Sequence, residues 1–170
     1  MAKIAALVTD LFEDSEYLSP KEALEEAGHE VVPISFETGT IHGKSENSAV
    51  EIEHTAKDTE PAEFDALLIP GGYSPDKLRS HECVLQFARH FAYQEKPIFT
   101  ICHGPQLLVN AEVLQGKNIT AVKNVAIDVK NAGANYFDEE VVTDRSGLIS
   151  SRTPDDLPAF NRAIVKALEK

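Results

Sequence analysis

The sequence KPIFTICHGPQLL, residues 96–108, holds the pattern from which the rest of the chain is interpreted. It begins with a short apolar run at 98–101, places Cys102 beside His103, and breaks at Gly104-Pro105 before a helix-forming segment. A strand that turns sharply into a helix, with a cysteine at the turn, is how α/β proteins expose a nucleophile. The helix start adds partial positive charge beside the sulfur, which we expect to favour the thiolate.

Apolar runs elsewhere in the chain predict the other strands of a mostly parallel sheet. Residues 3–9 and 65–69 are nearly continuous apolar runs, typical of strands buried on both faces. Residues 30–36 give another strand, in which Pro33 indicates a position at or near an edge. Because helical segments alternate with these strands, we expect one α/β domain over 1–170, a three-layer sandwich with helices on both faces of the sheet.

The first predicted helix has two candidate starts. Ser19 is a suitable cap, followed by proline at the first helical position and by Glu22 three residues after the cap. A start near Ser15, with a kink at Pro20, is the alternative. The other expected elements are a loop or hairpin at 39–48, a strand or hairpin arm at 50–53, a helix at 82–95, a strand at 119–122, a helix at 127–132, strands at 140–143 and 148–150, and a last helix that runs to residue 170.

Composition limits the class of protein and its partners. The chain has 170 residues, 42% of them apolar and 26% charged, as in ordinary globular domains. Its net charge of −12 argues against nucleic acid or an anionic membrane as a partner, since both need clustered lysine and arginine. Because there is no signal-peptide pattern, no apolar run of membrane-spanning length and no disulfide framework, we expect a cytoplasmic protein.

Two acidic residues are candidates for the site because each follows a predicted strand. Glu13 comes after the first strand and Asp76 comes after the strand at 65–69. In parallel sheets these strand ends meet at one edge, which Cys102 also occupies. A protonated carboxyl can donate to a thiolate, whereas an ionised one can accept a proton or orient a histidine.

The imidazole of His103 has an ambiguous position. Adjacent side chains at a sharp turn point apart, so His103 need not act as a close base for Cys102. Its backbone amide, at the helix start, is better placed as an oxyanion donor.

Cys83 lies between His81 and His90, a pattern that could suggest a metal site. The spacing straddles a helix start and lacks a fourth ligand, so a structural role is favoured and no metal is expected.

The motif Thr100-Ile-Cys-His-Gly-Pro105 resembles the intracellular protease PfpI branch of the ThiJ/PfpI superfamily. The resemblance covers essentially the whole chain, and several linked motifs make it more specific than the cysteine turn alone. The matching motifs, in order, are Phe12-Glu13-Asp14, Phe64 to Gly72, Pro75-Asp76, Asn131-Ala132-Gly133 and Ser151-Arg152-x-Pro-x-Asp156.

The resemblance implies a flavodoxin-like fold related to class I glutamine amidotransferase domains, and homo-oligomers, dimers at least. By position it implies that Cys102 is the nucleophile at a nucleophile elbow, that His103 is its partner, and that Glu13 is the acid contacting the sulfur. It also implies an oxyanion hole made by the backbone amides of Gly72 and His103. The third triad member would reach in from a neighbouring subunit; here it is Asp76, one methylene shorter than glutamate, and a shortfall of about 1 Å can cost ~100-fold in rate.

Two main functions follow from these residues. The first is a cofactor-free cysteine enzyme that acts on small reactive carbonyls, glyoxalase III-like or deglycase-like, or acts as an intracellular peptidase or amidase. The second is a redox-sensing stress-response protein whose Cys102 is reversibly oxidised, with little or no turnover. A holdase-type chaperone is a third, which the acidic sequence supports weakly.

Overall fold

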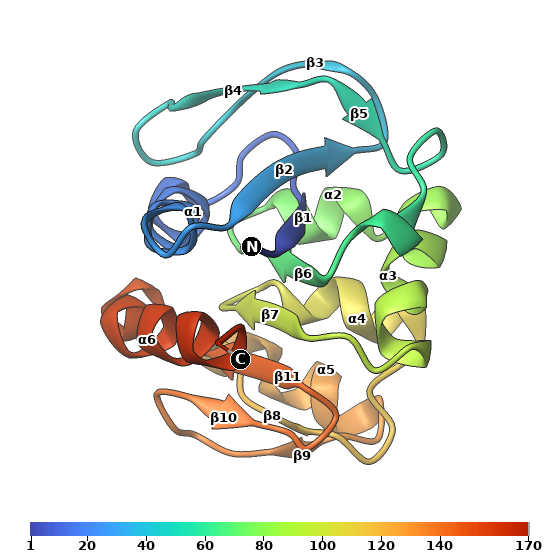
Figure 1. The fold of residues 1–170 in the computed structure, drawn as a ribbon. Helices are drawn as coiled ribbons and strands as arrows, with labels where there is room; N and C mark the ends of the chain where they lie inside the picture. Colours follow the sequence, from blue (N-terminus) through green and yellow to red (C-terminus); the bar gives the residue numbers. More distant parts are fainter. Residues whose placement is uncertain (170) are drawn as a thin grey trace.

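The computed structural model describes residues 1–169, and its centre is a seven-stranded sheet with the order β10-β11-β7-β6-β1-β2-β5 (Figure 1). Neighbouring strands in it are parallel, except that β10 runs antiparallel to β11. The strands are β1 (Lys3–Leu7), β2 (Glu30–Ser35), β5 (His54–Thr55), β6 (Ala66–Ile69), β7 (Ile98–Ile101), β10 (Val142–Thr143) and β11 (Leu148–Ser151). The mostly parallel α/β sandwich predicted from the sequence is confirmed.

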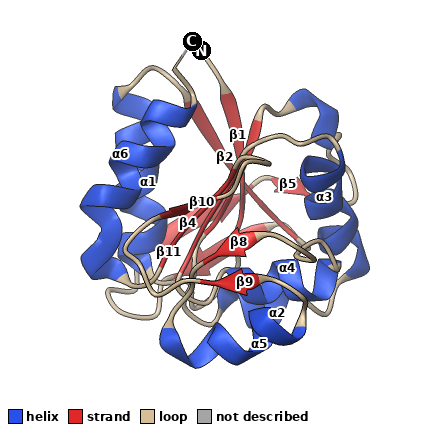
Figure 2. Cartoon of the chain, turned by 90° about the horizontal axis from the view of Figure 1, so that it is seen from below, coloured by secondary structure: helices blue, strands red, loops and turns tan. Residues whose placement is uncertain are grey.

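Helices cover both faces of the sheet, with α1 and α6 on one side and α2, α3, α4 and α5 on the other (Figure 2). The helices are α1 (Asp14–Glu26), α2 (Ser74–Leu78), α3 (Glu82–Tyr93), α4 (Pro105–Ala111), α5 (Ala126–Asn131) and α6 (Leu157–Ala167). Short 3₁₀ turns lie at Pro61–Glu63, Lys123–Val125 and Pro154–Asp156. None of the helices in residues 1–169 is both long and apolar enough to span a membrane.

The central strands divide their side chains between two cores. On β1, Ala5 and Leu7 pack toward the face covered by α3 and α4, whereas Ile4 and Ala6 pack toward α1 and α6. This alternation follows from the two-residue period of a strand. All four residues of β6 and all four of β7 are buried, which explains why these runs are apolar except for Thr100.

The first helix begins at Asp14, so the start predicted at Ser19 is wrong and the alternative near Ser15 is close to the observed one. Pro20 is buried inside the helix. Asp14 and Tyr17, both before the proline, are buried as well, so tertiary contacts outweigh the local capping signal of Ser19-Pro20. This shift matters for the site, because it makes residues 14–19 helical.

The shorter elements agree with the predictions in part. The segment 39–52 is a hairpin of β3 (Gly39–His42) and β4 (Ala49–Ile52). A small parallel pair of β8 (Asn118–Ile119) and β9 (Asn135–Tyr136) lies outside the main sheet. Helix α2 and strand β9 were not predicted. The last helix ends at Ala167 rather than continuing, and residue 170 lies outside the described residues.

We expect Phe160→Ala to lower the free energy of unfolding by about 3–5 kcal/mol, because it empties a large buried site between α6 and the sheet. Urea denaturation measures this loss. Tyr93→Ala is the matched control, since that ring is 69% exposed and its removal should change stability by no more than about 0.5 kcal/mol. Equal losses in the two variants would contradict the packing described.

Candidate active site

A pocket of about 210 Å³ opens at the carboxyl ends of β1, β6 and β7. From β1 the chain continues to β2 on one side, while β6 lies on the other side, so this is the point where the strand order reverses. Open α/β sheets bind ligands at such points. The pocket is lined by Glu13, Glu16, Lys44, Gly72, Tyr73, Cys102, His103 and Pro154.

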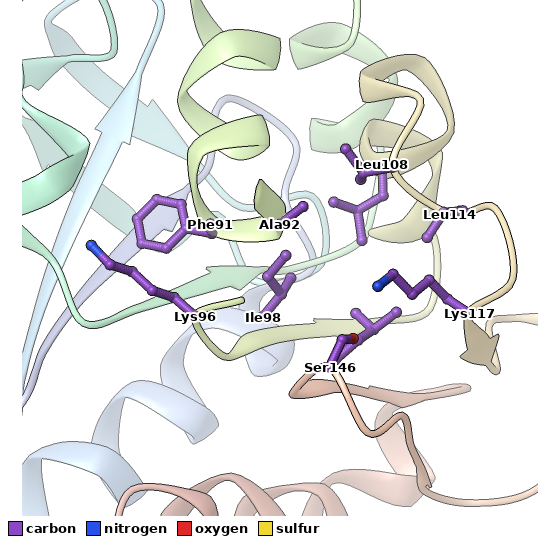
Figure 3. Close-up of a pocket in the computed structure, with 10 residues that line it drawn as sticks. Phe91, Ala92, Lys96, Ile98, Leu108, Leu114, Lys117 and Ser146 are labelled. Carbon is purple, nitrogen blue, oxygen red and sulfur yellow. The ribbon is translucent and has the colours of Figure 1, made fainter. Parts of the chain in front are cut away.

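Another space, shown in Figure 3, lies far from this edge. It opens near Ile98, at the start of β7, whereas Cys102 follows the end of β7. Its walls are mostly apolar side chains such as Phe91 and Leu114, and its volume of about 10 Å³ admits roughly one water molecule. It therefore does not compete with the Cys102 pocket as a reaction site.

The Cys102 backbone adopts a left-handed conformation, with φ of 61°. Non-glycine residues are uncommon there and are often found at functional sites. Two backbone hydrogen bonds hold the turn: the Cys102 N–H donates to Ser151 O at 3.1 Å, and the Val122 N–H donates to Cys102 O at 3.1 Å. The predicted nucleophile elbow is therefore present in the geometry.

The imidazole of His103 lies beside the sulfur, at 3.3 Å from Nδ1 to Sγ. The expectation that the two adjacent side chains point apart is wrong, because the left-handed turn at Cys102 brings them to one side. The His103 backbone amide also donates toward the sulfur, which favours the thiolate.

Glu16, not Glu13, is the carboxylic acid against the sulfur of Cys102. Its side chain is fully buried, and Oε1 accepts the Gly71 N–H at 2.9 Å. The other oxygen, Oε2, is buried and has no hydrogen-bond acceptor or donor partner among residues 1–169. A Cβ on residue 71 would collide with the Glu16 carboxyl, so glycine is required for this close approach.

Glu13 lies at the predicted edge of the sheet, but it is not the acid that contacts the sulfur. Glu13 lines the same pocket, yet its Oε2 accepts from Ser45 Oγ at 2.9 Å and pairs with Lys44 Nζ at 3.1 Å. The error came from the helix start, because a helix from Asp14 places Glu16 on the same inward stripe as Pro20.

Burial sets the protonation of the pair formed by Glu16 and Cys102. Burial raises the pKa of the Glu16 carboxyl to about 8, so it holds its proton at neutral pH. Burial also raises the pKa of the Cys102 thiol, and a charged Glu16 would raise it further. The expectation that the helix start lowers this thiol pKa is wrong in direction, since α4 is short and desolvation is the larger effect. At neutral pH the Cys102 thiol and the Glu16 carboxyl therefore each hold a proton in the free protein.

The remaining predicted site residues lie near the pocket. Gly72 lines it, and the His103 backbone amide reaches the sulfur, but their joint action as an oxyanion hole stays a prediction. Asp76 is on α2, largely exposed, with an oxygen 3.7 Å from Arg79. Burial lowers the pKa of His103, Lys44 lowers it further, and the charge of Asp76 opposes this only in part. Whether Asp76 reaches a neighbouring subunit stays a prediction.

The histidines on either side of Cys83 have separate structural contacts. His81 stacks on Phe36 with ring centroids 3.8 Å apart, and His90 Nε2 lies 2.9 Å from Lys96 Nζ. Cys83 packs partly buried against the core. These contacts favour the structural interpretation of the three residues.

A model of a known protein family matches this chain over nearly its whole length. The model of the DJ-1/PfpI family matches residues 2–167. The chain belongs to the DJ-1/PfpI family. This confirms the resemblance to the ThiJ/PfpI superfamily seen in the sequence motifs.

Two bacterial proteins are similar to this chain over nearly their whole lengths. Protein/nucleic acid deglycase 2 of Escherichia coli is 53% identical over 167 residues, covering 98% of this chain and 97% of that protein. General stress protein 18 of Bacillus subtilis is 48% identical over 169 residues, covering 99% of this chain and 98% of that protein.

Solved structures of the family share the fold. The DJ-1/ThiJ/PfpI-like and ferritin-like two-domain protein of Anabaena variabilis superposes with a TM-score of 0.95 at 37% identity, covering 99% of this chain and 48% of that one. Drosophila melanogaster DJ-1beta superposes with a TM-score of 0.89 at 22% identity, covering 98% of this chain and 90% of that one. At 22% identity, the similarity to Drosophila DJ-1beta shows only that the fold is shared.

The pKa of Glu16 is 4.5 in the unfolded chain and about 8 in the folded one. We expect the stability of Glu16→Gln, relative to the wild type, to increase as the pH rises through this range. Below this range both folded and unfolded wild-type chains hold the proton; above 4.5 the unfolded chain ionises while the folded one does not, so folding of the wild type weakens. The gain should be on the order of 2–4 kcal/mol at pH 8.

Urea unfolding at pH 5 and pH 8 measures this change. Glu30→Gln, at an exposed position, is the matched control for loss of a solvated carboxylate. A Glu16→Gln difference of the same size at both pH values would contradict a buried, protonated Glu16.

Proposed function

We propose that the protein is a cofactor-free cysteine enzyme that converts small reactive carbonyl compounds, such as 2-oxoaldehydes or their adducts with amines and thiols, into hydroxy acids. The observation that carries this proposal is the buried Glu16 carboxyl against the sulfur of Cys102. A nucleophile and a proton carrier of pKa about 8 in one small pocket suit a reaction that adds sulfur to a carbonyl and then moves protons between carbons.

In the first step the Cys102 thiol gives its proton to the His103 imidazole, whose Nδ1 lies 3.3 Å from Sγ, and the resulting thiolate adds to the aldehyde carbon. A carbon–sulfur bond forms, the carbonyl π electrons move to oxygen, and the proton of Glu16 passes to that oxygen to give a hemithioacetal. Glu16 is then a carboxylate. The His103 amide and the Gly72 amide would stabilise the developing oxygen charge.

In the next step Glu16 removes the C–H proton of the hemithioacetal carbon and returns it to the neighbouring carbonyl carbon, while the hemithioacetal O–H proton moves to the oxygen of that neighbouring carbon. This leaves a thioester on Cys102 and a hydroxyl on the adjacent carbon. Water then attacks the thioester, the carbon–sulfur bond breaks, and the products are a hydroxy acid and the free thiol. The proton held by His103 returns to Glu16, which restores the starting state. The net reaction adds one water and needs neither oxidant nor reductant.

A small substrate is favoured over a protein substrate. The pocket of about 210 Å³ has room for a few heavy atoms beside Cys102, and Tyr73 and Pro154 are among the residues that line it. The relative named protein/nucleic acid deglycase 2 supports carbonyl adducts as substrates. An intracellular peptidase would need a groove for an extended chain, for which this pocket gives less support.

We expect purified wild-type protein to convert methylglyoxal to lactate and Cys102→Ala or Cys102→Ser to lose that activity. Glu16→Gln cannot carry the proton and should lose about 100-fold or more in kcat/KM. Glu13→Gln should lose less than about tenfold, since Glu13 is paired with Lys44 instead of the sulfur. Lactate formation followed by chromatography measures all of these. Full activity in Glu16→Gln, or none in the wild type, would overturn the proposal.

Redox sensing by Cys102 is the second candidate, because a protonated Glu16 can donate a hydrogen bond to an oxidised sulfur. The stress-protein name of the Bacillus relative also fits this function. Peroxide would transfer oxygen to the sulfur with release of water. This function predicts no methylglyoxal turnover, together with stoichiometric oxidation of Cys102 that Glu16→Leu prevents, as seen by peptide mass spectrometry.

A further inference from the structure

Lys44 holds its ammonium group at the mouth of the Cys102 pocket. Its Nζ lies 3.1 Å from Glu13 Oε2 and 5.6 Å from the centroid of the Tyr73 ring. The side chain is one-third exposed, at 34%, so it borders both the pocket and solvent. An ammonium has three donors, and a single oxygen of Glu13 occupies one of them.

The loop that carries Lys44 is fixed by a buried carboxylate. Asp14 is 1% exposed and accepts the backbone N–H groups of Ser45 at 2.9 Å, Glu46 at 3.1 Å and Ser48 at 3.0 Å. The Lys44 N–H donates to Phe12 O at 2.9 Å. These bonds hold the pKa of Asp14 well below its usual range, so the anchor stays charged at neutral pH.

The charge of Lys44 acts on the reacting groups. Burial lowers the pKa of His103 and Lys44 lowers it further, whereas burial raises the pKa of Glu16 and Lys44 opposes that rise. The pKa of Lys44 is raised chiefly by its hydrogen bond with Glu13, with a smaller contribution from Cys102. The facing groups are Glu13, Glu16, Cys102, His103 and Tyr73. Glu16 is protonated at neutral pH and carries no charge. Lys44 is the lysine among the residues that line this pocket, so a substrate bound at the sulfur lies close to its positive charge.

We propose that Lys44 is a specificity-determining residue that favours reactive compounds carrying a carboxylate or phosphate group close to the carbon attacked by Cys102. The free donors of the ammonium would bind the anionic oxygens while Glu13 and Tyr73 keep it in place. This inference rests on the proposed function for its biological meaning, but anion selection at Cys102 can be tested without turnover. A merely structural Lys44 would form an ion pair with Glu13 and select nothing.

Iodoacetate and iodoacetamide provide matched probes. Both are attacked by the same Cys102 thiolate, which forms a carbon–sulfur bond and expels iodide, and they differ in carrying a carboxylate or a neutral amide. The ratio of their two rate constants cancels the thiolate fraction, so it reports anion selection. Peptide mass spectrometry separates modification of Cys102 from that of Cys83.

We expect Lys44→Met to lower the iodoacetate-to-iodoacetamide ratio at Cys102 by roughly fivefold and Lys44→Arg to keep it near the wild-type value. Lys166→Met is the matched control. Lys166 is exposed on the last turn of α6, so this substitution removes the same charge away from the pocket. Wild-type and Lys166→Met ratios should agree. A Lys44→Met ratio equal to the wild type would overturn the inference.

Removal of Lys44 also leaves Glu13 without its partner, and a second pair of variants separates that effect. Glu13→Gln should raise the ratio, and Glu13→Gln with Lys44→Met should still fall below Glu13→Gln alone. If the double variant matches Glu13→Gln, the lysine selects nothing and the inference fails. Methylglyoxal turnover is measured on the same wild-type sample: turnover without a Lys44 effect on the ratio defeats only this inference, and a Lys44 effect without turnover defeats only the proposed function.

Discussion

The contact between the Glu16 carboxyl and the Cys102 sulfur is the interaction on which the site depends. A buried carboxylate beside a buried thiolate would be costly, so at neutral pH both groups of the free protein stay protonated. The Gly71 amide fixes one carboxyl oxygen and leaves the other, which has no hydrogen-bond partner among residues 1–169, to carry the carboxyl proton. Around this pair, the pocket holds the charge of Lys44, the backbone amides of Gly72 and His103, and space for a small substrate.

The first turn of α1 links the two halves of the pocket. Asp14 fastens the loop that carries Lys44, and Glu16, two residues later, reaches the sulfur. Glu13, just before the helix, pairs with Lys44. A single helix start therefore positions the proton carrier, the loop and the ion pair, and the burial of Asp14 and Glu16 explains why the helix begins there despite the better local cap at Ser19.

Local patterns were enough to predict the sheet and the cysteine turn. Continuous apolar runs identify β1, β6 and β7, and the break after Ile101 identifies the elbow, because these features follow from backbone geometry and burial. Glu16 was missed because its assignment depends on a helix start that tertiary contacts decide. Lys44 was missed because the path of the 39–52 hairpin over the pocket is set by Asp14, far away in the sequence. The left-handed backbone of Cys102, which turns His103 toward the sulfur, is likewise a product of the folded chain.

The protonation state of Glu16 is the central claim, and infrared difference spectroscopy tests it most directly. The measurement subtracts the spectrum of Glu16→Gln from that of the wild type at pH 6 and at pH 9, on either side of the Glu16 pKa of about 8. The account predicts the carbonyl stretch of a protonated carboxylic acid at the lower pH, replaced by carboxylate bands at the higher one. Carboxylate bands for Glu16 already at pH 6 would contradict it.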